Sequence, residues 1–201
     1  YYTLTNKTGG DMVRVKYSRS SGYSFGRVYA SNGLSLGSLR KEVRHTIASD
    51  YYVDIDIQNA HPNFLYQTLD AVKPPNISYK FLGQYVNKRD EILLDVCKQY
   101  KVDRDAAKNL FIMLMYFGTF ESWCKHHGLV DVLPTSFIQS FIAERDIYTK
   151  YIVDNNPNLA LEIELNKAKA NKWLYNETAT VMAIWCQEIE QRVLHQVFQY
   201  A

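Results

Sequence analysis

Residues 51–70 are Tyr-Tyr-Val-Asp-Ile-Asp-Ile-Gln-Asn-Ala-His-Pro-Asn-Phe-Leu-Tyr-Gln-Thr-Leu-Asp, and this stretch predicts a strand followed directly by a helix. Over residues 51–57, apolar and polar side chains alternate, and β-branched and aromatic residues dominate, which is typical of a strand. The helix is expected to begin at Asn59 or His61, because Pro62 then falls in the first turn, where a missing N–H costs nothing.

Two carboxylates, Asp54 and Asp56, lie on one face of the predicted strand, about 6–7 Å apart, because alternate residues of a strand share a face. The apolar neighbours favour a largely buried strand, in which an acidic pair without a cation is costly. Carboxylate oxygens are ligands for hard divalent cations such as Mg²⁺. The pair is therefore a candidate metal site, and an exposed strand edge is the alternative interpretation.

The chain upstream of this strand is basic and rich in glycine. Residues 1–50 hold eight Lys and Arg against three Asp and Glu, whereas the 201-residue chain has 23 against 21. Six of the nine glycines also fall here, which predicts loops and short strands with tight turns. Such a segment suits an anion such as a phosphate backbone, with Arg27 as a candidate contact, and a solvated surface loop is the alternative.

Downstream of Asp70 the pattern is almost entirely helical. The expected helices cover residues 79–88, 89–100, 103–117, 119–127, 135–153 and 158–199, the last interrupted near Asn171. A few strands followed by many helices define an α+β fold. The apolar fraction of 47% and the charged fraction of 22% are those of globular proteins, and they exclude a disordered or collagen-like chain.

Nothing in the sequence indicates a membrane or an oxidising compartment. No run of about 18 apolar residues occurs, so no transmembrane segment is expected. The three cysteines, Cys97, Cys124 and Cys186, are far apart and odd in number, which is typical of thiols in a reducing compartment. The chain is therefore predicted to be intracellular.

A second group of candidate residues lies on the predicted helix 103–117. Arg104, Lys108 and Tyr116 share one broad helical face that spans roughly 18 Å, comparable to a stretched nucleoside triphosphate. Two cations at one end can hold phosphates, and a tyrosine ring at the other can stack against a base. An ordinary amphipathic helix with two exposed cations is the alternative.

Taken in order, four short motifs resemble those of the DNA polymerase I family (family A) and of its relatives, the single-subunit phage RNA polymerases. The first motif comprises Gly26-Arg27, residues 34–39 and residues 41–44, and the second is Asp56 followed by Asn59 and His61-Pro62. The third is Arg104-x3-Lys108-x7-Tyr116, and the fourth is Asn171 with Asn176-Glu177-Thr178-Ala179. The second motif is most similar to a divergent viral and mobile-element branch, in which polymerase domains are often fused to a helicase.

The resemblance implies a right-hand polymerase with a palm on a small antiparallel sheet and with helical fingers. Its domains would be 1–70 for the palm part and its nucleic-acid-contacting loops, 71–157 for the fingers and 158–201 for a long helix returning to the palm. The implied function is template-directed nucleotidyl transfer by a viral or mobile-element DNA polymerase domain, using two Mg²⁺ ions, with Mn²⁺ as an alternative. The implied partners are primer–template DNA, nucleoside triphosphates and a fused or associated helicase.

The same resemblance assigns a role to individual residues. Asp56 and Asp54 would hold the metal ions, and Lys108 would assist catalysis at the pyrophosphate. Nucleotide binding would fall to Arg104, Lys108, Tyr116 and His61, the last of which stands where the family has the glutamate that gates the ribose. Contacts with the nucleic-acid duplex would fall to Arg27, Arg44, Asn171 and Asn176.

The chain also departs from the family pattern. Phe117 is inserted between Tyr116 and Gly118, and the family's second catalytic aspartate would fall beyond Ala201. We therefore expect these residues alone to be inactive as a polymerase. The alternative functions are primer or RNA synthesis by the same fold, a non-catalytic nucleic-acid-binding module, and a glycosyltransferase that uses Asp54 and Asp56 to bind Mn²⁺.

Overall fold

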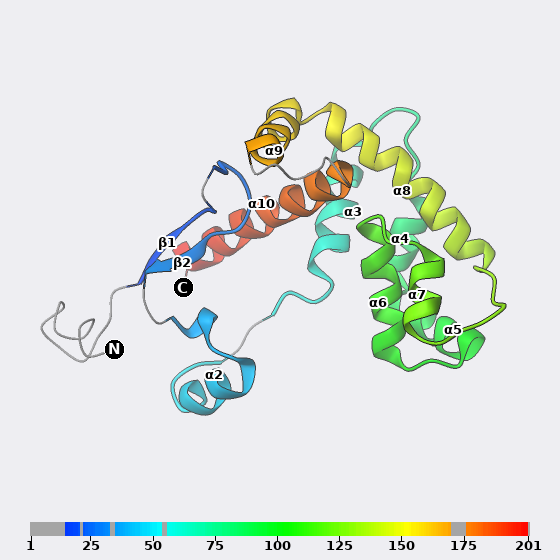
Figure 1. Ribbon diagram of the computed structural model, residues 1–201, viewed down its shortest axis with the longest axis horizontal. Coiled ribbons are helices and arrows are strands. Elements are labelled where there is room, and N and C mark those ends of the chain that lie inside the picture. The colour runs from blue at the N-terminus through cyan, green and yellow to red at the C-terminus, as the bar shows by residue number, and fades with distance from the viewer. Residues whose placement is uncertain (1–14, 21, 33–34, 54–55, 170–175, 201) are drawn as a thin grey trace, which may run out of the picture.

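The computed structural model describes residues 15–20, 22–32, 35–53, 56–169 and 176–200. Its two strands are β1 (Lys16–Ser18) and β2 (Tyr29–Asn32), and a short 3₁₀ turn, η1 (Leu36–Ser38), follows them. The helices are α2 (Lys41–Ala48), α3 (Ala60–Val72), α4 (Lys80–Asn87), α5 (Arg89–Tyr100), α6 (Arg104–Met115), α7 (Phe120–His126), α8 (Ser136–Asp154), α9 (Pro157–Lys169) and α10 (Glu177–Tyr200). Figure 1 shows the strands and α2 at one end of the molecule, the packed helices at the other, and α10 running between them.

Helices α3 to α10 form where the sequence predicts them, and capping side chains mark several of their starts. Asp103, Thr119 and Thr135 each accept a hydrogen bond from the backbone N–H three residues further along, at the beginning of α6, α7 and α8. Each cap satisfies one of the free N–H groups of a first helical turn and contributes about 1 kcal/mol. At their other ends, α3 and α5 terminate at Lys73 and Lys101, which adopt the left-handed conformation.

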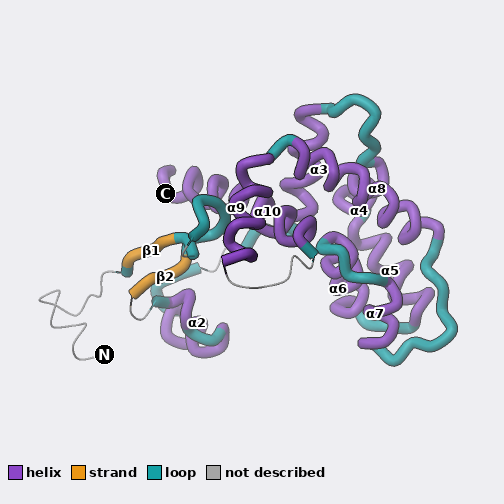
Figure 2. The backbone as a smooth tube through the Cα atoms, turned by 45° about the horizontal axis from the view of Figure 1, so that its top comes forward, coloured by secondary structure: helices purple, strands orange, loops and turns teal. Residues whose placement is uncertain are grey.

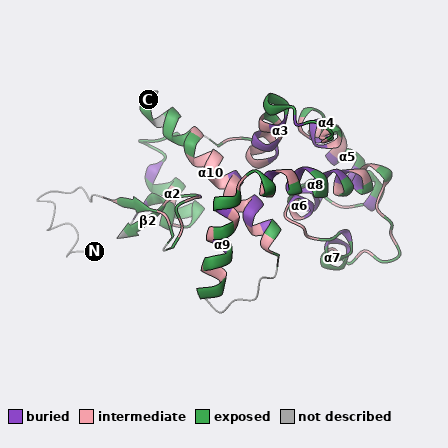
Figure 3. Cartoon of the chain, turned by 90° about the horizontal axis from the view of Figure 1, so that it is seen from above, coloured by how far each residue is buried: buried purple, intermediate pink, exposed green. Residues whose placement is uncertain are grey.

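The main core lies among α3 to α8, with Met182 of α10, and uses much of the aromatic content of the sequence. Tyr85 and Phe111 stack with 4.3 Å between ring centroids, and Phe141 meets both rings edge-on. Trp123 is fully buried, and its indole N–H donates a hydrogen bond to the Ala106 carbonyl at 3.0 Å. Figure 3 shows that the buried residues are concentrated on these helices, whereas α2 and the strands are mainly exposed.

A smaller apolar cluster attaches the N-terminal part of the chain to α9 and α10. Leu159, Ile163 and Val181 are buried there, and Tyr23 and Phe25, from the loop between the two strands, pack against them. The loop reaches this position through tight turns, because Gly22 and Gly26 have positive φ angles of 86° and 91°. The strands are therefore fixed to the helical part by side chains of their connecting loop.

The strand expected over residues 51–57 does not form in the described part of that range, residues 51–53 and 56–57. Tyr51, Tyr52 and Val53 are exposed, so the prediction of a buried strand is wrong. A strand needs a neighbour to satisfy its backbone groups, and the sheet in the described residues pairs only β1 with β2. Alternation in the sequence cannot show whether such a neighbour exists.

The predicted loops and short strands of residues 1–50 are confirmed only in part, because α2 is a helix. Three of its eight residues are β-branched, which disfavours a helix in the sequence pattern, while Glu42 in its first turn favours one. The α+β class is confirmed at the coarse level, since the described part of the chain is mainly helical and contains a small antiparallel sheet (Figure 2). Two strands do not establish a polymerase palm. Among the described residues, no helix is both long and apolar enough to cross a membrane.

Candidate nucleic-acid interface

Two glutamates on α10 hold the N-terminal part of the chain in place. Glu188 accepts hydrogen bonds from Arg19 at 3.1 Å and from the Gly26 N–H at 2.9 Å, and Glu190 pairs with Arg27 at 2.5 Å. Burial by itself raises the pKa of Glu188, but the hydrogen bonds from Gly26, Arg192 and Arg19 outweigh burial, and the net pKa is lowered. The carboxylate of Glu188 is therefore charged at neutral pH and binds the loop firmly.

Three of the predicted site residues, Arg27, His61 and Tyr116, meet at Glu190. His61 Nδ1 is hydrogen-bonded to the Tyr116 hydroxyl, and His61 Nε2 lies 3.4 Å from the Glu190 carboxylate. Burial raises the pKa of Tyr116 well above its usual range, with smaller contributions from Cys186 and Glu190, so this hydroxyl stays protonated. The cluster connects α3, the end of α6, α10 and the loop between β1 and β2. Its geometry is that of a structural contact that holds these elements together.

The two cations predicted to bind phosphates are on the exposed side of α6. Arg104 pairs with Asp90 at 2.5 Å, and Lys108 is exposed. Asp56 is also exposed, in the segment just before α3. Within the described residues, no hydrogen bond or ion pair joins Asp56 to Arg104 or Lys108, so the structure does not bring the carboxylate and the cations into one contact network.

Two predicted residues, Asp54 and Asn171, lie outside the described residues. Asn176 is exposed at the start of α10, where it has a left-handed backbone and its carbonyl accepts a hydrogen bond from the Thr180 N–H. In the part of the chain that the structure describes, no three His, Cys, Asp or Glu side chains come together to hold a metal ion. The two-metal site at Asp54 and Asp56 therefore stays a prediction.

An exposed combination of cations and tyrosines surrounds α2, and the sequence interpretation missed it by assigning two of the tyrosines to a buried strand. Arg44 and Tyr52 line one hollow of about 460 Å³, together with Leu36, His45 and Val53. We call the described residues between 15 and 53 the basic segment. Its exposed tyrosines, with their exposed fractions, are Tyr17 (59%), Tyr29 (51%), Tyr51 (81%) and Tyr52 (68%).

The cations of the basic segment fall into two groups. Arg19 and Arg27 are neutralised by Glu188 and Glu190 on α10. The second group has no carboxylate partner within the described residues and consists of Lys16, Arg40, Lys41 and Arg44. The sequence signal that could have indicated this surface is the group of cations Arg40, Lys41 and Arg44 followed closely by Tyr51 and Tyr52.

The chain is similar to "Putative helicase V13" of Sputnik virophage, with 29% identity over 207 residues. The match covers 100% of this chain and 25% of that protein, so the chain spans about a quarter of the length of this relative. No family model matches the chain, and no solved structure matches it.

This similarity contradicts the predicted function of a template-directed DNA polymerase. The relative aligns along the whole chain and is described as a helicase, so the prediction of a nucleotidyltransferase is wrong. The coarser expectations agree with that description of the relative. They are a viral protein, an enzyme and an involvement with nucleic acid. The resemblance of the four motifs to family A is a separate matter, which the comparisons do not test, and it stays a prediction.

Proposed function

We propose that this chain is a single-stranded nucleic-acid-binding module within a larger viral protein of the helicase class. The observation that carries the proposal is the hollow shared by Arg44 and Tyr52. There, a cation without a carboxylate partner among the described residues lines the same surface as a tyrosine that is 68% exposed. Cations that follow the phosphate backbone and rings on which bases stack are the two components of sequence-independent single-strand binding.

The remaining cations of the basic segment support the same partner. Arg40 and Lys41 stand at the start of α2, one and a half turns or less from Arg44, so phosphates on either side of a stacked base meet further positive charge. On the sheet, Tyr17 is opposite Ala30 and Tyr29 is opposite Ser18, which places the two rings on opposite faces of the hairpin. One strand of nucleic acid therefore uses the α2 side, with a single hairpin tyrosine at most.

The ion pairs with α10 give this interface a rigid support. Glu188 and Glu190 fix the loop between the strands, and in doing so they occupy Arg19 and Arg27. The cations that remain for a phosphate backbone are those around α2. The description of the virophage relative as a helicase supports nucleic acid as the partner.

The proposal is tested by fluorescence anisotropy of the 201-residue chain with a labelled oligothymidylate of about 12 nucleotides. Because stacking contributes about 1–3 kcal/mol per base, we expect Tyr52→Ala to weaken binding by about tenfold. Arg44→Gln should reduce the slope of log affinity against log salt by about 0.7, the value for one lost phosphate contact on a single strand.

The matched control is Lys98→Gln, which removes one exposed positive charge from α5 without touching the basic segment. It should bind the oligonucleotide as the unchanged chain does. If Tyr52→Ala and Arg44→Gln both behave like this control, or if the unchanged chain shows no salt-dependent binding, the proposed function is refuted. A duplex of the same sequence is expected to bind more weakly, because its bases cannot stack on an exposed ring.

A further inference from the structure

A groove along α3 and α4 lies in the helical part of the molecule and takes no part in the proposed function. It consists of two hollows of about 580 Å³ and 340 Å³, and residues Asn87 and Lys88 line both of them. The larger hollow is lined by two tyrosines, two lysines and two amides, which are Tyr66, Tyr79, Lys80, Lys88, Gln84 and Asn87. The smaller one is polar and extends from the segment before α3 to the first turn of α5.

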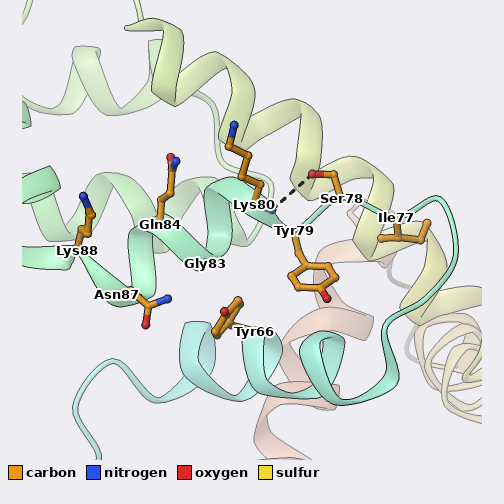
Figure 4. A pocket seen from close by; sticks show the side chains of 9 residues that line it. All are labelled: Tyr66, Ile77, Ser78, Tyr79, Lys80, Gly83, Gln84, Asn87 and Lys88. Carbon is orange, nitrogen blue, oxygen red and sulfur yellow. Dashed lines mark hydrogen bonds between the residues drawn. The ribbon is translucent and has the colours of Figure 1, made fainter.

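The larger hollow presents aromatic surface on one side. Tyr66 and Tyr79 pack edge to face with 6.1 Å between ring centroids, and Figure 4 shows Tyr66 rising from α3 toward Gly83 on α4, between Tyr79 and Asn87. Only glycine permits this approach, because a Cβ at position 83 would lie 2.7 Å from Tyr66 Cε2. Aromatic faces of this kind are surfaces on which a nucleobase stacks, and the neighbouring amides offer both a donor and an acceptor to a base edge.

The smaller hollow contains two buried donors without a partner. Asn59 Nδ2 and Arg89 Nε are shielded from solvent, and neither makes a hydrogen bond. Buried donors are normally paired, so two of them lining one hollow indicate a missing acceptor. Asn59 is held in this position by a left-handed backbone, with φ of 53°, directly before α3.

The charges around the groove favour an anionic acceptor. Lys80, Lys88 and Arg89 line it, against the two carboxylates Asp90 and Glu91. Asp90 is paired with Arg104 at 2.5 Å, so its negative charge is compensated. Arg89 lines the same hollow as the unpartnered amide, and its guanidinium, which also contacts the Tyr85 hydroxyl, is suited to bind phosphate oxygens.

We infer that this groove binds a nucleoside monophosphate unit, either free or at the 5′ end of a strand. The base packs against Tyr66 and Tyr79, with the amides of Gln84 and Asn87 at its edge. The phosphate occupies the smaller hollow, and the side chains of Arg89 and Asn59, whose Nε and Nδ2 are covered in the free chain, turn toward it and donate to its oxygens. Gln84 on α4 and Arg89 at the start of α5 line the two adjoining hollows, so the base and its phosphate occupy one hollow each.

The experiment measures binding of AMP to the 201-residue chain by NMR titration, with adenosine and inorganic phosphate as separate probes. We expect AMP to bind saturably and about tenfold more tightly than either part alone. Asn59→Asp replaces the unpartnered donor by a negative acceptor and tolerates the same backbone, so it should weaken AMP about tenfold and leave adenosine unchanged. Tyr79→Ala should weaken AMP and adenosine together.

The matched control is Asn158→Asp, which makes the same chemical change at an exposed position of α9. If AMP binds Asn59→Asp and Tyr79→Ala as tightly as it binds this control, or if AMP does not bind saturably, the inference is overturned. A 5′-phosphorylated oligonucleotide that displaces AMP identifies the end of a strand as the ligand, and a failure to displace it identifies the free nucleotide. The variants leave Arg44 and Tyr52 intact, so the groove is tested independently of the basic segment.

Discussion

Glu144 is a buried carboxylate that stabilises the start of α4. It is 4% exposed and accepts hydrogen bonds from the Ser78 hydroxyl at 2.5 Å and from the Leu82 N–H at 2.9 Å. We expect Glu144→Ala to lower the free energy of unfolding by about 1–3 kcal/mol, because the buried Leu82 N–H would then have no partner. Glu144→Gln keeps one carbonyl acceptor and should lose less. Urea unfolding followed by tryptophan fluorescence measures both changes.

The control for this prediction is Glu164→Ala, which removes an exposed carboxylate from α9. Its free energy of unfolding should stay within about 0.5 kcal/mol of the unchanged chain. Equal losses for Glu144→Ala and Glu164→Ala would show that the Glu144 hydrogen bonds contribute no net stability.

Individual site residues were predictable only where a motif marked them. Arg27, His61 and Tyr116 were chosen from the resemblance, and the structure brings them together around Glu190. Glu190 itself was not predicted, because its partners are 129 and 163 residues away in the chain and no local pattern links them. The unpartnered amide of Asn59 was equally invisible, since the sequence marks that position as a helix start and as part of the second motif, and neither indicates an unpaired donor.

At the scale of elements, prediction was accurate where interactions between neighbours in the sequence determine the element. It failed where the element depends on contacts between residues far apart in the sequence. Helices α5 and α8 were placed to within one residue, because apolar periodicity and capping residues such as Thr135 act locally. The strand at residues 51–57 depended on a pairing partner that the sequence pattern cannot specify. Tyr51 and Tyr52 were therefore assigned to the core, although they are exposed.

The attachment of the loop between β1 and β2 to α10 should depend on pH and on Glu188. The pKa of Glu188 is lowered below its ordinary value of 4.5, so its contribution is fully present above about pH 4.5 and is lost as the pH falls through the lowered pKa. The Gly26 N–H donates to Glu188 at 2.9 Å, so acidification should lower its protection factor, which is the intrinsic exchange rate at each pH divided by the observed rate. Glu188→Gln should lower this protection factor at neutral pH and remove most of its pH dependence.

Hydrogen-exchange mass spectrometry of the peptide around Gly26 measures this effect, with Glu164→Gln as the control on the exposed side of α9. The control should keep the protection and the pH dependence of the unchanged chain. Unaltered exchange in Glu188→Gln would mean that Tyr23 and Phe25, packed on α9 and α10, hold the loop without the carboxylate.

At the scale of the whole molecule, the main core and the basic segment are built from different parts of the chain. Every member of the main buried cluster lies at or beyond Leu65. The basic segment is attached by the packing of Tyr23 and Phe25 and by the ion pairs to Glu188 and Glu190. The stability of the molecule and the proposed interface for nucleic acid should therefore be separable.

Deletion of residues 1–55 tests this separation. We expect the remaining helices to unfold in one cooperative transition, because the deletion removes no member of the main core, with some loss of stability where Leu159 and Ile163 become exposed. Oligothymidylate binding should disappear with Arg44 and Tyr52, whereas AMP binding should persist, since Asn59, Tyr79 and Arg89 are all retained. Circular dichroism during heating and the two binding assays measure these outcomes on one variant. A non-cooperative transition would show that the basic segment is part of the folding unit, and retained oligonucleotide binding would move the interface to the helical part of the molecule.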